Sequence, residues 1–179
     1  MLYATGTVAN GQSIDGDHWT HTKGVFMLCA PPQPSAGITP YFDGQMNQIE
    51  NMIGPGDPPP YSIINEQGQG LVLLVGDHAS RVIPRALNDL GLEETLLEKH
   101  IAYDIGTRKL VHHLSQHLDA PAVLAGYSRL VVDLNRSLED PSVMPEVSDG
   151  TPIPGNLNIS AEHRNQRIHS FYTPYRKAI

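Results

Sequence analysis

The apolar run Leu71-Val72-Leu73-Leu74-Val75-Gly76 decides the fold. Its short length and its lack of polar alternation are typical of a strand that is buried on both faces. The best helical pattern follows at residues 104–118, and two further apolar segments, 122–125 and 130–133, are strand candidates. Because a strand, a helix and a strand in this order form a crossover between parallel strands, we expect an α/β fold with an at least partly parallel sheet.

Local signals predict where the helices begin and end. Asp104 is a good N-cap for the long helix, and Ala120-Pro121 ends it. Two shorter helices are expected at residues 84–90, closed by Gly91, and at residues 92–100.

The remaining segments are less regular. Residues 137–159 are rich in turn formers, and a loop of this length in a compact domain is usually functional or disordered. Ser160 then caps a polar helix near the end of the sequence. Residues 1–53 show little periodicity, and we interpret them as an irregular extension outside the domain, which would comprise residues 54–179.

The composition argues against several classes of function. The chain has 179 residues, enough for one domain, and its 12 Lys and Arg against 19 Asp and Glu give a net charge of -7, which disfavours nucleic-acid and anionic-membrane partners. A single cysteine, Cys29, excludes a disulfide framework and a cysteine zinc cluster. The sequence has neither an apolar run of membrane-spanning length nor a signal-peptide pattern, so we expect a cytoplasmic protein. The oligomeric state stays open.

The first cluster of chemical interest is Asp77-His78-Ala79-Ser80, directly after the buried strand. Open parallel sheets bind ligands beyond the carboxyl ends of their strands, so His78 is a candidate metal ligand. Asp77 is a candidate for orienting its imidazole ring. The alternative, which position alone favours, is a histidine that only caps or satisfies a turn.

The second cluster is the segment 129–136, in which charges emerge from an otherwise apolar strand candidate. Such charges have to pair or to face a ligand. Because a guanidinium group binds a carboxylate through two parallel hydrogen bonds, Arg129 and Arg136, with Asn135, are candidate substrate-binding residues. An ion pair between Arg129 and Asp133 explains the pattern equally well.

Asp104 and the helix histidines are further candidates. Asp104 has the chemistry of a catalytic or metal-ligating carboxylate, although a plain N-cap role is at least as well supported. His113 and His117 are four residues apart on the long helix, a spacing that can chelate a metal. They flank or oppose its apolar face, however, which favours a solvated face.

Taken together, these clusters resemble the N-formylglutamate amidohydrolase family. The similarity covers about residues 54–176, with the motifs in order and at natural spacing. No single motif decides it, but the ordered set is specific. The matching stretches are residues 54–59, 75–80 with Pro84, 90–92, 100–106, 127–136 and 145–156.

The resemblance implies a three-layer α/β/α sandwich with a mixed sheet, like that of zinc exopeptidases. It implies a metal-dependent enzyme, with zinc as the metal, that hydrolyses N-formyl-L-glutamate to formate and L-glutamate in histidine breakdown. His78 and Asp104 would be metal ligands, Asp104 also a catalytic candidate, and Arg129, Asn135 and Arg136 would bind the small anionic substrate. Residues 133–136 also resemble the carboxylate-binding stretch of aspartoacylases, so a deacylase of other N-acyl amino acids is an alternative.

The chain departs from the family pattern in three places. It has Arg81 where family members usually carry Asn and where zinc exopeptidases have a metal-binding Glu, and it has Arg176 where the family often has His. Family members also continue into a later strand with a His-Ser-Phe-Thr-Pro motif, the expected further metal ligand. Residues 169–174 resemble that motif but align better with the polar helix preceding it. We therefore expect a truncated chain with an incomplete, weakly zinc-binding site, and a non-catalytic fragment is the rival interpretation.

Overall fold

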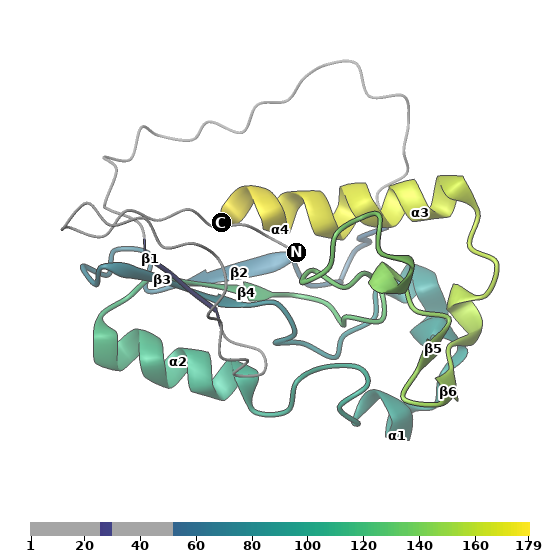
Figure 1. Ribbon diagram of the computed structural model, residues 1–179, viewed down its shortest axis with the longest axis horizontal. Helices are drawn as coiled ribbons and strands as arrows, with labels where there is room; N and C mark the ends of the chain where they lie inside the picture. Colours follow the sequence, from purple (N-terminus) through teal and green to yellow (C-terminus); the bar gives the residue numbers. More distant parts are fainter. Residues whose placement is uncertain (1–25, 30–51) are drawn as a thin grey trace, which may run out of the picture.

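The computed structural model describes residues 26–29 and 52–179, which form a mixed α/β fold around a four-stranded sheet with the order β1-β3-β4-β2 (Figure 1). The two inner strands, β3 (Val72–Gly76) and β4 (Ala122–Ala125), are parallel. The edge strands β1 (Phe26–Cys29) and β2 (Tyr61–Ile64) pair antiparallel with β3 and β4 respectively. The two predicted inner strands and the partly parallel sheet are therefore confirmed.

The crossover between β3 and β4 is helix α2 (Thr107–Leu118). The helix was predicted, but its N-cap is Gly106, whose left-handed φ of 93° starts the first turn without any side-chain cap. The prediction that Asp104 caps this helix is therefore wrong. The side chain of Asp104 turns instead toward His78 and Arg129.

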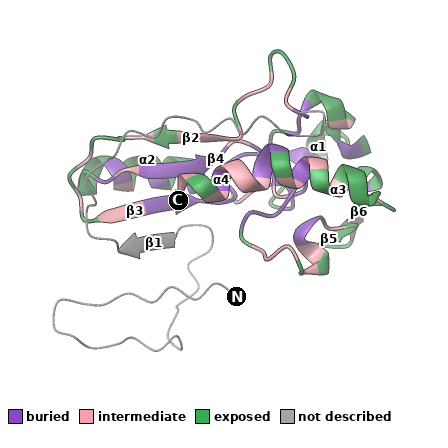
Figure 2. Cartoon of the chain, turned by 90° about the horizontal axis from the view of Figure 1, so that it is seen from above, coloured by how far each residue is buried: buried purple, intermediate pink, exposed green. Residues whose placement is uncertain are grey.

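Two apolar clusters lie on the two faces of the sheet, as the strand period of two requires. Leu74 packs in the smaller cluster with Val111 of α2. The next residue, Val75, packs in the larger cluster with Phe171 and Tyr175 near the C-terminus. Figure 1 shows α2 on one side of the sheet and the C-terminal helices on the other, and Figure 2 shows β4 buried between them.

The C-terminal helical segment has a π turn in its middle. Helix α3 (Ala161–Arg167) continues into the π turn η4 (Ile168–Tyr172) and then into α4 (Thr173–Ala178). The predicted cap is confirmed, because Ser160 Oγ accepts a hydrogen bond from the His163 N–H at 3.1 Å. Residues 169–174 are helical, in agreement with their placement in the polar helix rather than in a strand.

The predicted strand at residues 130–133 is wrong. Residues 130 and 131 belong to a turn in which the Val131 N–H bonds back to Ser128 O at 3.0 Å, and the Asp133 N–H bonds to Val143 O, outside the sheet, at 2.7 Å. Leu130, Val131 and Val132 are nevertheless buried in the larger cluster. The apolar run thus reflects burial in the core and not membership of the sheet.

The first predicted short helix differs from expectation in type and the second in length. Residues 84–90 gave a 3-10 segment, η1 (Arg85–Gly91), which contains left-handed residues and so cannot continue as an α-helix. The helix expected at 92–100 is a single turn, α1 (Glu94–Leu97).

The long loop at 137–159 is ordered by short elements. They are the 3-10 turns η2 (Pro141–Val143) and η3 (Pro154–Asn156) and the hairpin of β5 (Val147–Ser148) and β6 (Thr151–Pro152). In the described part of the chain, no helix is long and apolar enough to cross a membrane.

The expected domain boundary near residue 54 is only partly visible. Strand β1 lies within the segment 1–53, and the Met52 N–H donates to Ser170 Oγ at 3.2 Å. The rest of that segment, 1–25 and 30–51, lies outside the described residues. The boundary therefore stays a prediction.

Candidate active site

His78 lies at the centre of the candidate site. It follows β3 by two residues, at the edge of the sheet where the parallel strands β3 and β4 have their carboxyl ends. The residue is 4% exposed, and its backbone carbonyl accepts the N–H of Asp104 at 3.0 Å. This backbone bond fastens the loop before α2 to the end of β3.

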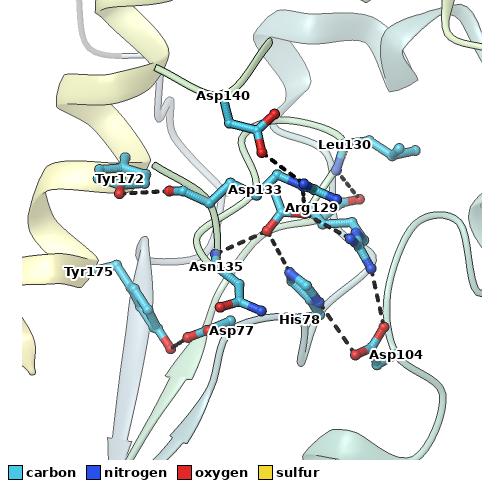
Figure 3. Close-up of polar contacts among 12 residues, drawn as sticks. Asp77, His78, Asp104, Arg129, Leu130, Asp133, Asn135, Asp140, Tyr172 and Tyr175 are labelled. Carbon is cyan, nitrogen blue, oxygen red and sulfur yellow. Dashed lines mark hydrogen bonds and ion pairs between the residues drawn. The ribbon is translucent and has the colours of Figure 1, made fainter. Parts of the chain in front are cut away.

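Two carboxylates flank the imidazole ring of His78 (Figure 3). Nε2 lies 2.8 Å from Asp133 Oδ1, and Nδ1 lies 3.4 Å from Asp104 Oδ2. Asp133 was expected only as a partner of Arg129, so its contact with His78 is new. The two residues are 55 positions apart in the sequence, so no local pattern could indicate the contact.

Both candidate arginines contact Asp133, and Arg129 also contacts Asp104. Arg129 Nη2 is 2.8 Å from Asp133 Oδ2, and its Nη1 is 3.5 Å from Asp104 Oδ1. Arg136 Nε is 3.4 Å from Asp133 Oδ2. The structure thus brings His78, Asp104, Arg129 and Arg136 together, and it contains the ion pair that was the alternative explanation for Arg129.

The second guanidinium group has a protein partner of its own. Arg136 Nη1 lies 2.9 Å from Asp140 Oδ2, a residue that the sequence did not single out. Of the two possibilities for this charge, pairing and facing a ligand, the structure shows pairing with Asp133 and Asp140. The i,i+4 spacing of the two residues, just before Pro141, is the one signal that could have found the pair.

Asn135, the third predicted substrate-binding residue, is exposed. Its backbone N–H donates to Asp133 Oδ1 at 3.0 Å. Its side chain forms no hydrogen bond with any residue in the described ranges. The amide is therefore free to contact a ligand, and that role stays a prediction.

Asp77 does not orient His78, contrary to expectation. Its carboxylate accepts a hydrogen bond of 2.6 Å from the hydroxyl of Tyr175, and both residues are buried. Burial raises the pKa of Asp77, although the hydrogen bond from Tyr175 and the charge of His78 act in the opposite direction. Asp133 occupies the orienting position in its place.

Asp133 is held in its ionised form. Burial alone would raise its pKa, but the hydrogen bond and charge of His78, the charge of Arg129 and the Asn135 N–H together outweigh burial and lower it. In the neutral form of His78, the ring proton would lie on Nε2, which faces this carboxylate at the shorter distance. The lone pair of Nδ1 then faces Asp104, and a cation between them, either a proton or a metal ion, would remove the repulsion.

The described residues contain no group of three or more His, Cys, Asp or Glu side chains arranged to hold a metal ion. The histidines of α2 do not add to the site. His113 and His117 are exposed, as expected, and His117 Nδ1 lies 2.8 Å from the carbonyl of His113.

A hollow of about 320 Å³ lies away from this chemistry. Ile64, Ser115 and Asp119 are among its lining residues. Ile64 pairs with Ala122 at the amino end of β4, so the hollow is at the sheet edge opposite His78. The side-chain chemistry, and not this hollow, locates the candidate site.

Residues 71–179 match the family model described as N-formylglutamate amidohydrolase. The chain belongs to this family. The assignment made from the sequence is therefore confirmed, and the N-formylglutamate amidohydrolase match includes every residue of the site around His78.

A solved structure supports the same fold. The chain is similar to "The crystal structure of gene product Atu2144 from Agrobacterium tumefaciens", with a TM-score of 0.69 and 32% sequence identity. The match covers 72% of this chain and 51% of that chain, so this chain spans about half the length of that protein. No curated protein matches the sequence.

Proposed function

We propose that the site around His78 hydrolyses N-formyl-L-glutamate to formate and L-glutamate. The observation that supports this most is the buried His78 between two carboxylates, with two partly exposed guanidinium groups beside it, in a member of this family. The three-layer, zinc exopeptidase-like architecture, a cytoplasmic location and a role in histidine breakdown belong to the same proposal.

His78 and Asp104 would hold a divalent metal, for which we propose zinc. An imidazole nitrogen and a carboxylate oxygen are both common zinc ligands, at about 2.0–2.2 Å from the ion. Two such ligands of one tetrahedral ion are about 3.4 Å apart, and the distance between His78 Nδ1 and Asp104 Oδ2 is 3.4 Å. Asp133 on the other ring nitrogen would orient the imidazole, as carboxylates commonly do for metal-binding histidines.

The charge of the site makes the metal and the substrate depend on each other. Arg129 and Arg136 face Asp104, Asp133 and Asp140, so with a neutral His78 the cluster carries a formal charge of -1. A dianionic substrate is repelled by such a site. A divalent cation would change the formal charge to +1, so we expect substrate binding to require the metal.

The two arginines retain the capacity to bind a carboxylate. A guanidinium group has five N–H donors, and the ion pairs of Arg129 and of Arg136 each involve only two nitrogen atoms. Their side chains are 27% and 39% exposed. Together with the exposed amide of Asn135, they would hold the carboxylates of the substrate.

Asp104 has two candidate roles in the reaction. A bound metal would lower the pKa of a coordinated water molecule and polarise the acyl oxygen. Asp104 would either ligate the metal beside His78 or act as the general base that takes a proton from water. Its 22% exposed side chain, with contacts no shorter than 3.4 Å, can move to serve either role.

Zinc binding and formate release, measured on the same variants, test the proposal. His78→Ala should lose both, whereas His113→Ala, which removes an exposed histidine of α2, should lose neither. In Asp104→Asn, loss of both would identify a ligand, and loss of hydrolysis with retained zinc would identify a base. Because catalytic zinc sites usually have three protein ligands, the affinity of this pair should be low.

The acyl preference needs a panel of substrates. N-formyl-L-glutamate, N-acetyl-L-glutamate and N-acetyl-L-aspartate differ in the acyl group or in the chain length of the amino acid. Preference for N-acetyl-L-aspartate would support the aspartoacylase-like alternative. Release of none of the acyl groups at saturating zinc would contradict the proposed reaction for this chain.

A further inference from the structure

The segment 128–136 carries most of the site but is not a strand of the sheet. Arg129, Asp133 and Arg136 all lie on it, and its backbone forms turns. Asp133 must nevertheless stay within 2.8 Å of His78. Contacts from other parts of the chain therefore have to fix the position of this loop.

The buried side chain of Asn156 forms a hydrogen bond with the loop. The residue is 1% exposed, and its Nδ2 donates to Leu130 O at 2.9 Å and to Pro145 O at 2.8 Å. Its Oδ1 accepts a hydrogen bond of 2.6 Å from Arg167 Nη1. Both ends of this amide are thus satisfied, which fixes its orientation.

Arg167 is a buried cation that has no carboxylate partner among residues 26–29 and 52–179. The residue is 2% exposed, and its guanidinium donates only to neutral oxygens, those of Val131 at 3.2 Å, Gly155 at 2.9 Å and Asn156. Within the described ranges its Nε has no hydrogen-bond partner, and no carboxylate forms an ion pair with it. Burial lowers the pKa of Arg167 to about 10, so the group stays charged at neutral pH.

Protein stability alone does not explain a buried charge of this kind. Well-packed apolar side chains of similar volume are often as stabilising as buried ionic groups, or more so. The planar fork of arginine does, however, fix several carbonyl groups in one geometry. The carbonyls that it fixes belong to Val131, in the site loop, and to the turn that contains Asn156.

The π turn adds a second contact from the same helical segment. It is closed by the Thr173 N–H on Ile168 O, a bond between residues five apart. Arg167 precedes this turn, and Tyr172 is its last residue. The hydroxyl of Tyr172 donates to Arg136 O at 2.9 Å, at the other end of the loop.

We propose that Asn156, Arg167 and Tyr172 are positioning residues that hold the loop 128–136 in its working geometry. Asn156 and Arg167 fix Leu130 and Val131, and through them the approach of Asp133 to His78. Tyr172 fixes the backbone of Arg136, and so its side chain. The effect on catalysis rests on the proposed function, whereas the effect on the loop does not.

Asn156→Asp is the sharpest variant, because it keeps the shape and the acceptor for Arg167 but loses the two donated hydrogen bonds. Amide hydrogen exchange, followed by mass spectrometry, should become about tenfold faster in residues 128–136 and stay unchanged in β3 and β4. The kcat/KM for N-formyl-L-glutamate should fall by about tenfold or more, the usual effect of losing an outer contact of a site. Asn165→Asp, on the exposed face of α3, is the matched control.

Tyr172→Phe removes only one hydroxyl group. It tests the same proposal if the Asn156→Asp variant does not fold. It should raise KM several-fold with little change in kcat, because it frees Arg136 and not Asp133. Tyr61→Phe, in β2, is the control. Unchanged exchange in the loop, equal acceleration throughout the chain, or a mobile loop with unchanged kcat/KM would overturn the proposal. If the unaltered chain hydrolyses nothing, the proposed function fails, and the exchange data still decide whether these residues position the loop.

Discussion

The two carboxylates that flank His78 differ in almost every physical respect. Asp133 is 3% exposed and lies 2.8 Å from both His78 and Arg129, with a backbone N–H of Asn135 as a further donor. Asp104 is 22% exposed, and its contacts with the same two side chains are 3.4 and 3.5 Å long. One carboxylate is fully engaged by the protein, and the other is only loosely held.

This difference suggests that the two carboxylates have different roles. A buried carboxylate whose oxygens are all occupied orients its neighbours but has no capacity left for a ligand. A loosely held, partly exposed carboxylate can exchange its protein contacts for a metal ion or a water molecule. We therefore expect Asp133 to matter for both folding and activity, and Asp104 for activity and metal binding alone.

The largest expected effect is that of Asp133→Asn on stability. The variant removes the negative charge that pairs with Arg129 and that accepts a hydrogen bond from His78. Breaking a buried ion pair costs about 3–5 kcal/mol. Because Arg129 is partly exposed, we expect the free energy of unfolding in urea to fall by about 3 kcal/mol, the lower end of that range. Asp149→Asn, which removes an exposed partner of His100, is the control and should change it little.

Asp104→Asn should have the opposite profile. Its long and partly exposed contacts should contribute less than about 1 kcal/mol to the free energy of unfolding. If Asp104 is a ligand, zinc affinity, measured by competition with a chelating dye, should fall by at least about tenfold. Equal losses of stability in the Asp104 and Asp133 variants would remove the basis of the comparison.

The parts of the fold that the sequence predicted are those with local signals. β3, α2 and β4 follow one another closely, and each has an unambiguous pattern of apolar residues. Candidate site residues were found in the same way, because His78 directly follows a strand and the arginines interrupt an apolar segment. Family resemblance then added roles to these positions.

The parts that it missed depend on distant contacts. Residues 130–133 have the apolar character of a strand, and only the bond from Asp133 to Val143 shows that the backbone turns away from the sheet. Asp104 has the residue type of an N-cap, but the left-handed Gly106 takes that position. The hydrogen bond between Asp77 and Tyr175 spans 98 positions, so no local pattern could reveal it.

Arg136→Ala tests whether Arg136 binds a ligand in addition to forming ion pairs with Asp133 and Asp140. Loss of a charged hydrogen bond should weaken binding of N-formyl-L-glutamate by about 1.5–3 kcal/mol in the presence of zinc, measured by calorimetry. Stability should change by no more than about 1 kcal/mol, because the ion pairs of Arg136 are partly exposed. Arg85→Ala, which removes another exposed arginine near a carboxylate, should leave binding unchanged. Equal affinities in the two variants would leave Arg136 with a purely structural role.

The smallest expected effect concerns Asp140. This prediction tests whether a carboxylate of this site has to be buried to be held in place. Asp140 is partly exposed, yet its pKa is lowered to about 2, first by the hydroxyl of Ser142, then by the Ser142 N–H and by Arg136. A lowered pKa in the folded state means that its stabilising effect is complete above the ordinary value of 3.8 and is lost as the pH falls through about 2. Ser142→Ala should therefore be slightly less stable than the unaltered chain at pH 5, and this gap should close between about pH 4 and pH 2. Thermal unfolding over that range measures the gap, with Ser148→Ala as the control, and the contribution of Asp133 cancels because both proteins retain it. A difference in stability that persists at pH 2 would mean that Ser142 stabilises the protein through packing and not through the charge of Asp140. Only buried carboxylates such as Asp133 would then be held in place by hydrogen bonds and ion pairs.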